Sequence, residues 1–455
     1  MRCVVDTGGD GWWSWHNESL DETEARSGGD RGTLTQRVRP LGVPRWRRVL
    51  PWVATTVFGP GLLVMLADTD AGSVVTAAQS GARFRLAMVL PELALIPILY
   101  VVQEMTVRVG LATQLGHGAL IRREYGRVWA TVAALTLLAA CTGAMVTELA
   151  GVAGVGSLVG WPTAPTVAAA AFGLIAVLLF GRYRRIEAIG IAVGALELLF
   201  VVAAFTVHPG GSRLLASLGG HWSLAHGYGM LLAANVGAVV MPWMIYYQQE
   251  AVIDKGYGAG PAGVRRARRN TALGAVATQV VMVAIVVALG ATIGSRDPGH
   301  SLGSIGDIAA ALTPFLGHRG AIILFGLGMV GASVTAALVV SVAGAWGIAE
   351  VLGWRHSLND EPRAAAGFYA VAVGGIVASA LAVVASVNLV ALSVDVEVMN
   401  AVLLPVVLGF LVLLERRLDP THRMRGPRRV VTYALTALVV VVGLATAVGV
   451  IARVV

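Results

Sequence analysis

The sequence predicts an all-α membrane protein built from two inverted halves. Hydrophobic residues make up 56% of the 455 residues and charged residues only 13%, whereas a soluble domain carries about 25% charged residues. Apolar runs of about twenty residues, the length that a helix needs to cross a bilayer, recur along the whole chain. Two of these runs, five spans apart, are interrupted by residues that break a helix. Because five is an odd number, the second half has the opposite orientation in the membrane.

The apolar runs divide into eleven expected spans. In order, these are 52–83 (interrupted), 86–112, 128–158, 164–181, 186–207, 226–252 (interrupted), 270–294, 320–350, 364–387, 389–414 and 430–452. The amphipathic segment from Ser304 to Gly317 is too short and too polar to span a bilayer. We expect it to lie across the outer face between spans seven and eight.

The chain is expected to have three parts. Residues 1–49 are polar and lack the apolar core of a signal peptide, so we expect a disordered cytoplasmic tail. Residues 50–415 carry the first ten expected spans. Residues 416–455 form a basic cytoplasmic loop and the eleventh helix. Cys3 lies in the tail and Cys141 in a span, so a disulfide between them is not expected.

The orientation follows from the basic residues. With the N-terminus in the cytoplasm, 24 Lys and Arg residues of the loops fall inside and six fall outside. This asymmetry obeys the positive-inside rule and supports an odd number of spans, with the C-terminus outside. The formal net charge of +8 therefore reflects topology and does not indicate nucleic-acid binding. We expect a multi-pass protein of the cell (plasma) membrane that contacts the lipid bilayer.

The first interrupted span carries two carboxylates into an apolar run, in the stretch LADTDAGSVVTAAQSG. Its break is expected at Ala67–Gly72, and that of span six at Gly237–Met244, which contains Pro242. Discontinuous helices at matching points of two inverted halves indicate the central site of a transporter. The alternative is that span one ends early and that Pro242 is an ordinary kink.

A carboxylate in the middle of a membrane needs a partner. No Lys or Arg lies within the interior of spans one or six to neutralise Asp70, so the candidate counter-charge is a bound cation. A carboxylate combined with backbone carbonyls suits Mg²⁺, Ca²⁺ or Mn²⁺. The thioether of Met241 would shift the preference towards softer transition metals.

These residues resemble the NRAMP family of divalent metal ion transporters. The hallmark of that family is Asp-Pro-Gly-Asn in helix one and Met-Pro-His in helix six, where this chain has DAGS at Asp70–Ser73 and MPW at Met241–Trp243. Further matches are GPGLLV (Gly59–Val64), QEMTVRVG (Gln103–Gly110) and VTELAGVAG (Val146–Gly154). The resemblance covers roughly residues 50–415 and implies that this part forms a ten-helix transporter core. It implies a LeuT-type fold, an inverted 5+5 helix repeat with discontinuous helices one and six, plus an eleventh helix.

The resemblance also implies a ligand set. The metal would be held by the side chains of Asp70, Ser73 and Met241 and by the carbonyls of Ala67 and Ala238. Residues expected on the pathway or behind the ligands are Asp68, Glu148, Trp243, Gln103, Asp395 and Asn400. Helix ten contributes a polar side chain in the family. Asp395 and Glu397 are two residues apart, about 200° around a helix, so at most one of them faces the pathway.

The chain departs from the family pattern at several positions. Ser73 replaces Asn, Ala71 replaces Pro, and Gly151 replaces the second acidic residue of helix three, while Glu148 keeps the first. Trp243 replaces the His that is tied to proton movement in the family, and it is expected to pack beside the site and narrow it. These changes put proton coupling in doubt and resemble the branch associated with Mg²⁺ transport. Because Met241 favours Mn²⁺ or Fe²⁺, both possibilities remain open.

The expected function is transport of divalent metal cations, Mn²⁺/Fe²⁺ or Mg²⁺, into the cytosol by alternating access. The metal is a substrate, and no cofactor is expected. The sequence contains neither His-Glu-x-x-His nor a P-loop, so we do not expect an enzyme. We expect a monomer or a weak homodimer. The alternative is a Na⁺-coupled carrier of an amino acid or another organic solute, although Asp70 would repel the carboxylate of such a substrate.

Overall fold

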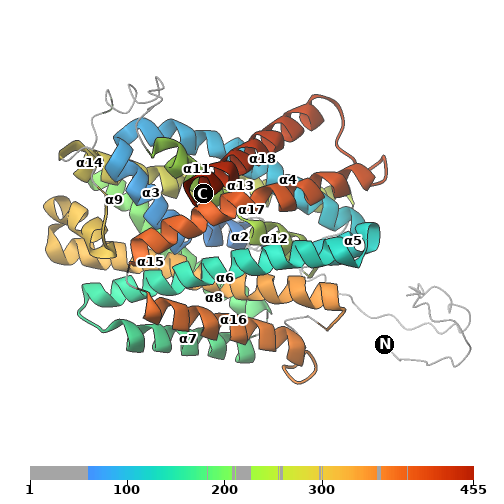
Figure 1. Cartoon of the computed structure of the whole chain (residues 1–455), viewed down its shortest axis with the longest axis horizontal. Coiled ribbons are helices and arrows are strands. Elements are labelled where there is room, and N and C mark those ends of the chain that lie inside the picture. Colours follow the sequence, from blue (N-terminus) through green and yellow to red (C-terminus); the bar gives the residue numbers. More distant parts are fainter. Residues whose placement is uncertain are drawn as a thin grey trace, which may run out of the picture. The chain divides into compact units, whose positions relative to one another are not determined.

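Every regular element is a helix in the part of the chain that the computed structural model describes, namely residues 60–181, 183–207, 211, 227–254, 256, 260–296, 299, 301–355, 360–386 and 388–454. The predicted tail, residues 1–49, lies outside the described residues (Figure 1). The helices are α2 (Pro60–Asp68), α3 (Ala71–Phe84), η1 (Arg85–Met88), α4 (Val89–Thr113), α5 (His117–Tyr125), α6 (Arg127–Leu158), α7 (Thr163–Phe180), α8 (Tyr183–Gly194), η2 (Ala195–Glu197), α9 (Leu198–Val207), α11 (Tyr228–Val239), α12 (Pro242–Asp254), α13 (Pro261–Ala291), α14 (Ile293–Arg296), α15 (Ile305–Leu352), α16 (Ala366–Ala385), α17 (Leu389–Arg417) and α18 (Gly426–Val454).

The helices match the predicted spans. Among the described residues, ten stretches are long and apolar enough to cross a membrane. One of them, Ala71–Thr113, is 43 residues long and contains both α3 and α4, which belong to the first two expected spans. The predicted all-α membrane architecture is therefore confirmed.

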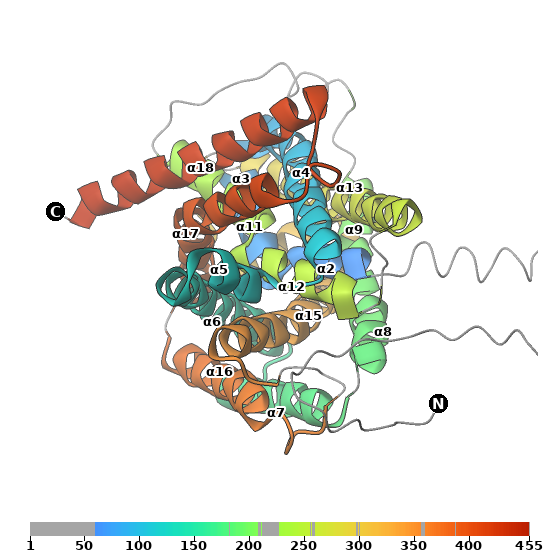
Figure 2. The ribbon, with the colours of Figure 1, turned by 90° about the vertical axis from the view of Figure 1, so that its right-hand side faces the viewer.

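Both predicted breaks are present. Helix α2 ends at Asp68 and α3 begins at Ala71, while α11 ends at Val239 and α12 begins at Pro242. Residues Leu63–Ala67 belong to one buried apolar cluster and Ala71 begins the contribution of α3 to a second cluster, so the first break lies where two apolar clusters meet. Figure 2 shows α2, α11 and α12 enclosed by α4, α15 and α17.

The segment predicted between spans seven and eight forms the first part of α15. Ser304 and Asp307 make a capping box, in which Ser304 Oγ accepts from Asp307 N at 3.2 Å and Asp307 Oδ2 accepts from Ser304 N at 2.9 Å. Gly317, with φ of 70°, then separates this segment from the apolar remainder of the helix, which packs along α6. The boundary predicted at Gly317 is thus a kink in α15.

A cluster of three arginines around Glu104 joins α18 to the core. Glu104 Oε1 lies 2.7 Å from Arg108 Nη2, 2.6 Å from Arg428 Nη2 and 3.6 Å from Arg268 Nε. These side chains come from α4, α13 and α18. Because Glu104 is only 1% exposed, its charge requires such partners, and the cluster holds the last helix against two core helices.

The short helix α5 is tied to α12 and α15 by polar contacts. His117 Nδ1 bonds Gln249 Oε1 at 3.0 Å, and Gln249 Nε2 donates to the Leu115 carbonyl at 2.8 Å. Glu350 Oε2 accepts from the backbone N–H of Ala119 at 3.0 Å. The His117 ring is fully buried, and this burial lowers its pKa to about 4.

The burial of His117 predicts a loss of stability in acid. Because the pKa of His117 is lower in the folded protein than in the unfolded chain, its contribution is complete above pH 6.5 and declines as the pH falls towards 4, by up to about 3 kcal/mol. His117→Asn keeps an amide donor near the position of Nδ1 and cannot become charged. The melting temperature in detergent should therefore fall less between pH 7.5 and pH 5 for His117→Asn than for the wild type. An equal fall in both proteins would contradict this role.

Candidate functional site

The first break is organised by Asp70, which caps helix α3. Asp70 Oδ1 accepts from Ser73 N at 2.7 Å, the side-chain bond expected of an N-cap. Asp70 is fully buried, and its Oδ2 has no hydrogen-bond donor among the described residues, although the neighbouring carboxyl of Glu148 lies close enough to share a proton with Asp70. One carboxylate oxygen thus holds the helix, while the other remains available in the interior of the protein.

Backbone carbonyls are released at both breaks. In a continuous helix Ala71 N would donate to the Ala67 carbonyl, but here it donates to Glu148 Oε2 at 3.1 Å. Pro242 has no N–H for the carbonyl of Ala238, and the hydroxyl of Ser73 donates to that carbonyl instead, at 2.9 Å. The Ser73 bond joins the two breaks. It also means that two of the predicted metal ligands, Ser73 and Ala238, contact each other.

Glu148 brings helix α6 to the first break. It is fully buried, and beyond Ala71 N it accepts from the hydroxyl of Thr147 at 3.3 Å. Its carboxyl lies close enough to that of Asp70 for the two groups to interact electrostatically. A methyl group on Gly151, one turn further on, would lie 2.6 Å from Ala71 Cβ, so the acidic residue of the family pattern does not fit there without movement.

Helix α17 adds Glu397 to this cluster. Glu397 is fully buried, accepts from Asn400 Nδ2 at 3.0 Å, and interacts electrostatically with Asp70. Its side chain packs against Gly72 of α3, where an added methyl group would lie 3.2 Å from the Glu397 carboxyl carbon. Asn400 was among the predicted residues. The sequence offered Asp395 or Glu397 as its neighbour, and the structure brings Glu397 to the break.

Asp395 lies elsewhere. It lines a separate cavity of about 310 Å³, together with Gln79, Arg83 and Asn388. The half-turn between positions 395 and 397 directs the two side chains to different places, as their spacing on a helix requires. The predicted residue Gln103 is buried on α4, and no hydrogen bond in the described chain connects its side chain to either break.

A second pair of carboxylates, those of Asp68 and Glu197, adjoins the first break. Asp68 ends α2, and Glu197, in the short helix η2, interacts electrostatically with it. Both residues are buried, Asp68 at 2% and Glu197 at 0% exposure. Thr69 bonds Thr278 of α13 through their hydroxyls. Nothing in the sequence around Glu197 distinguishes it from other span residues, because only the tertiary fold places η2 beside the first break.

The second break presents Met241 and Trp243. Met241 occupies the unwound position before α12, and Trp243 lies in the first turn of that helix. Both side chains are completely buried, and Trp243 Nε1 donates to Met241 Sδ at 3.0 Å. Trp243, predicted to pack beside the site, thus contacts the predicted ligand Met241.

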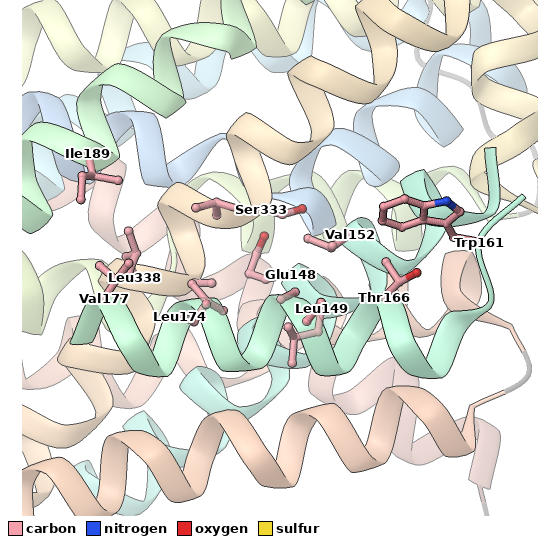
Figure 3. Close-up of a pocket in the computed structure, with 15 residues that line it drawn as sticks. Glu148, Leu149, Val152, Trp161, Thr166, Leu174, Val177, Ile189, Ser333 and Leu338 are labelled. Carbon is pink, nitrogen blue, oxygen red and sulfur yellow. The ribbon is translucent and has the colours of Figure 1, made fainter. Parts of the chain in front are cut away.

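A cavity of about 410 Å³ adjoins the site behind Glu148. Figure 3 shows Glu148 and Ser333 in its middle, with Trp161 and Thr166 at one end and Ile189 at the other. The remaining lining is apolar and comes mainly from α6, α7 and α15. Glu148 therefore both lines this cavity and interacts with Asp70.

The charges of the site are uncompensated within the described chain. Asp68, Asp70, Glu148 and Glu397 are buried and form no ion pair with a described Lys or Arg. A buried carboxylate requires a cation or a proton to offset the cost of leaving water. Among the described residues, no three His, Cys, Asp or Glu side chains converge closely enough to hold a metal. A cation at Asp70 would therefore also need backbone, hydroxyl or thioether ligands.

The chain is similar in sequence to a family of metal transporters. A profile described as natural resistance-associated macrophage protein-like matches residues 61–449. A divalent metal cation transporter MntH of Brucella suis is 26% identical over 302 residues, which cover 64% of this chain and 66% of the relative. MntH 1 of Pseudomonas aeruginosa is 28% identical over 303 residues, 63% of this chain and 67% of the relative. The similarity thus spans about two thirds of the length of these relatives.

Solved structures share the fold. A mutant of the Eremococcus coleocola manganese transporter has a TM-score of 0.69 and 16% identity, covering 87% of each chain. A Na⁺-coupled sialic acid symporter has a TM-score of 0.58 and 12% identity, covering 85% of this chain and 88% of its own. At these identities the likeness shows the arrangement of helices only. The broken helices one and six therefore belong to the LeuT-type architecture that the sequence predicted.

Proposed function

The chain belongs to the natural resistance-associated macrophage protein (NRAMP) family, and we propose that it carries divalent metal cations across a membrane. The observation that carries the proposal is the buried Asp70, whose oxygen Oδ2 has no hydrogen-bond donor among the described residues. Asp70 lies at the first helix break, which the bond between Ser73 and the Ala238 carbonyl joins to the second break. A divalent cation would supply the positive counter-charge that this buried carboxylate requires. The curated MntH relatives, named as divalent metal cation transporters, support the same substrate class.

The proposed ligands are Asp70, Met241 and the carbonyls of Ala67 and Ala238, with Ser73 joining after its bond to Ala238 opens. Glu148 and Glu397 stand beside Asp70 and attract the cation or take up a proton when the metal leaves. Rocking of the two helix repeats would expose the site to each side of the membrane in turn. The distribution of Lys and Arg supports a cytoplasmic N-terminus. We propose that the metal moves into the cytosol through the plasma membrane.

The metal is proposed to be Mn²⁺/Fe²⁺ or Mg²⁺. Mg²⁺ retains its water molecules and prefers oxygen ligands, which suits the neighbouring carboxylates of Glu148 and Glu397. A thioether ligand favours the transition metals. A Na⁺-coupled carrier of an organic acid is disfavoured, because Asp70 and its neighbours would repel the substrate carboxylate.

Uptake into proteoliposomes tests the proposed function. The purified chain is reconstituted with a pH-sensitive dye inside the vesicles, and Mn²⁺ and Mg²⁺ uptake are measured side by side against protein-free vesicles. We expect saturable uptake of at least one metal. Acidification during uptake would establish proton coupling, and uptake without acidification would establish an uncoupled carrier. Uptake of neither metal, combined with Na⁺-driven uptake of an amino acid, would overturn the proposal in favour of the organic-solute carrier.

A further inference from the structure

Trp243 forms a hydrogen bond to Met241, whose sulfur is the one soft atom among the proposed metal ligands. The indole N–H donates to the thioether sulfur at 3.0 Å, and neither side chain has any exposed surface. Met241 is one of the two residues between α11 and α12, and the carbonyl of Ala238, three residues earlier, receives the Ser73 hydroxyl from the first break. The hydrogen-bonded sulfur therefore belongs to the wall of the proposed metal site.

The buried indole depends on this bond. An indole N–H is a donor only, and a buried one needs an acceptor. The thioether sulfur is a weak acceptor with two electron pairs, and the indole N–H engages one of them. The hydrogen bond withdraws electron density from the sulfur and fixes its orientation, so it weakens the sulfur as a metal ligand. Any cation that does not use sulfur avoids this cost.

We propose that Trp243 is a specificity-determining residue that disfavours soft divalent cations by holding the thioether of Met241. This inference rests on the proposed metal transport. Soft cations such as Cd²⁺ gain most from a sulfur ligand, so they lose most when it is engaged. Mn²⁺ and Mg²⁺ bind mainly through Asp70 and the oxygen ligands, which the indole does not contact. The methionine then contributes less to the choice of metal than a thioether without a hydrogen bond would.

The first test removes only the donor. Trp243→Phe keeps an aromatic ring and lacks the N–H, and the dissociation constants of Cd²⁺ and Mn²⁺ are measured by calorimetry on the purified protein. We expect the preference for Cd²⁺ over Mn²⁺ to rise about tenfold, the size of effect that one hydrogen bond produces. The same substitution in a Met241→Leu background should leave the preference unchanged. An equal rise in both backgrounds would mean that the smaller ring acts by volume, and no rise would overturn the proposal.

The Met241→Leu substitution, which is of similar volume, measures how strongly the sulfur binds the metal. We expect it to lower Cd²⁺ affinity about tenfold less in the wild type than in Trp243→Phe protein, because the indole N–H weakens the sulfur only where it is present. Equal losses in the two proteins would overturn the proposal. If the wild type binds and transports no divalent metal, the proposed function has failed instead, so the two failures are distinguishable.

Discussion

Replacing Asp70 with asparagine is expected to abolish divalent metal uptake. An amide oxygen can still cap α3 through the Ser73 N–H, as Asp70 Oδ1 does at 2.7 Å, so the helix start is preserved. The substitution removes the negative charge that a divalent cation needs at the centre of the membrane. Changes to residues that merely orient metal ligands cost about 10- to 100-fold, so loss of a ligand charge should reduce uptake by at least about a hundredfold. Initial rates of Mn²⁺ and Mg²⁺ uptake into proteoliposomes measure this.

Asp395→Asn provides the matched control for Asp70→Asn. The same acid-to-amide change is made at a carboxylate that lies in a different cavity, beside Gln79 and Arg83. We expect Asp395→Asn to retain uptake within about threefold, because its charge acts only at a distance through water. If Asp70→Asn kept its uptake while the melting temperatures of both variants matched the wild type, metal binding at the break would be refuted.

The breaks could be predicted because their causes are local. Pro242 removes a backbone donor wherever it stands, and Asp70 followed by Ser73 is a sequence that starts a helix. Neither property depends on the rest of the chain, and the structure places both breaks within the predicted segments. The same holds for the apolar spans, whose length and composition are set by the bilayer.

The composition of the site depended on tertiary contacts that no local pattern contains. Asp395 and Glu397 are equally acidic in the sequence, and only the packing of α17 against α3 and α11 selects Glu397. Glu197 reaches Asp68 because η2 lies in the middle of a span, which its sequence does not reveal. The bond between Ser73 and Ala238 joins residues 165 positions apart. Local sequence therefore predicts where the helices break, and packing decides which side chains lie beside the breaks.

The position of Glu397 depends in turn on one glycine of α11. A methyl group on Gly237 would overlap the carbonyl oxygen of Glu397 and lie 2.8 Å from Ala401 N. Both obstacles are backbone atoms of α17, which cannot rotate away as a flexible side chain can. Gly237 thus permits the close contact of α11 with α17 that sets Glu397 beside Gly72.

Gly237→Ala is therefore expected to destabilise the protein strongly. Overpacking of this kind costs about 1–3 kcal/mol, and more where backbone must shift, although alanine by itself favours a helix. Gly229→Ala is the matched control on the same helix, because a methyl group there meets no atom within 4 Å. Melting temperatures in detergent should fall for Gly237→Ala and stay level or rise for Gly229→Ala. Equal melting temperatures for the two variants would mean that α11 and α17 do not approach each other at Gly237, and the placement of Glu397 beside the first break would lose its support.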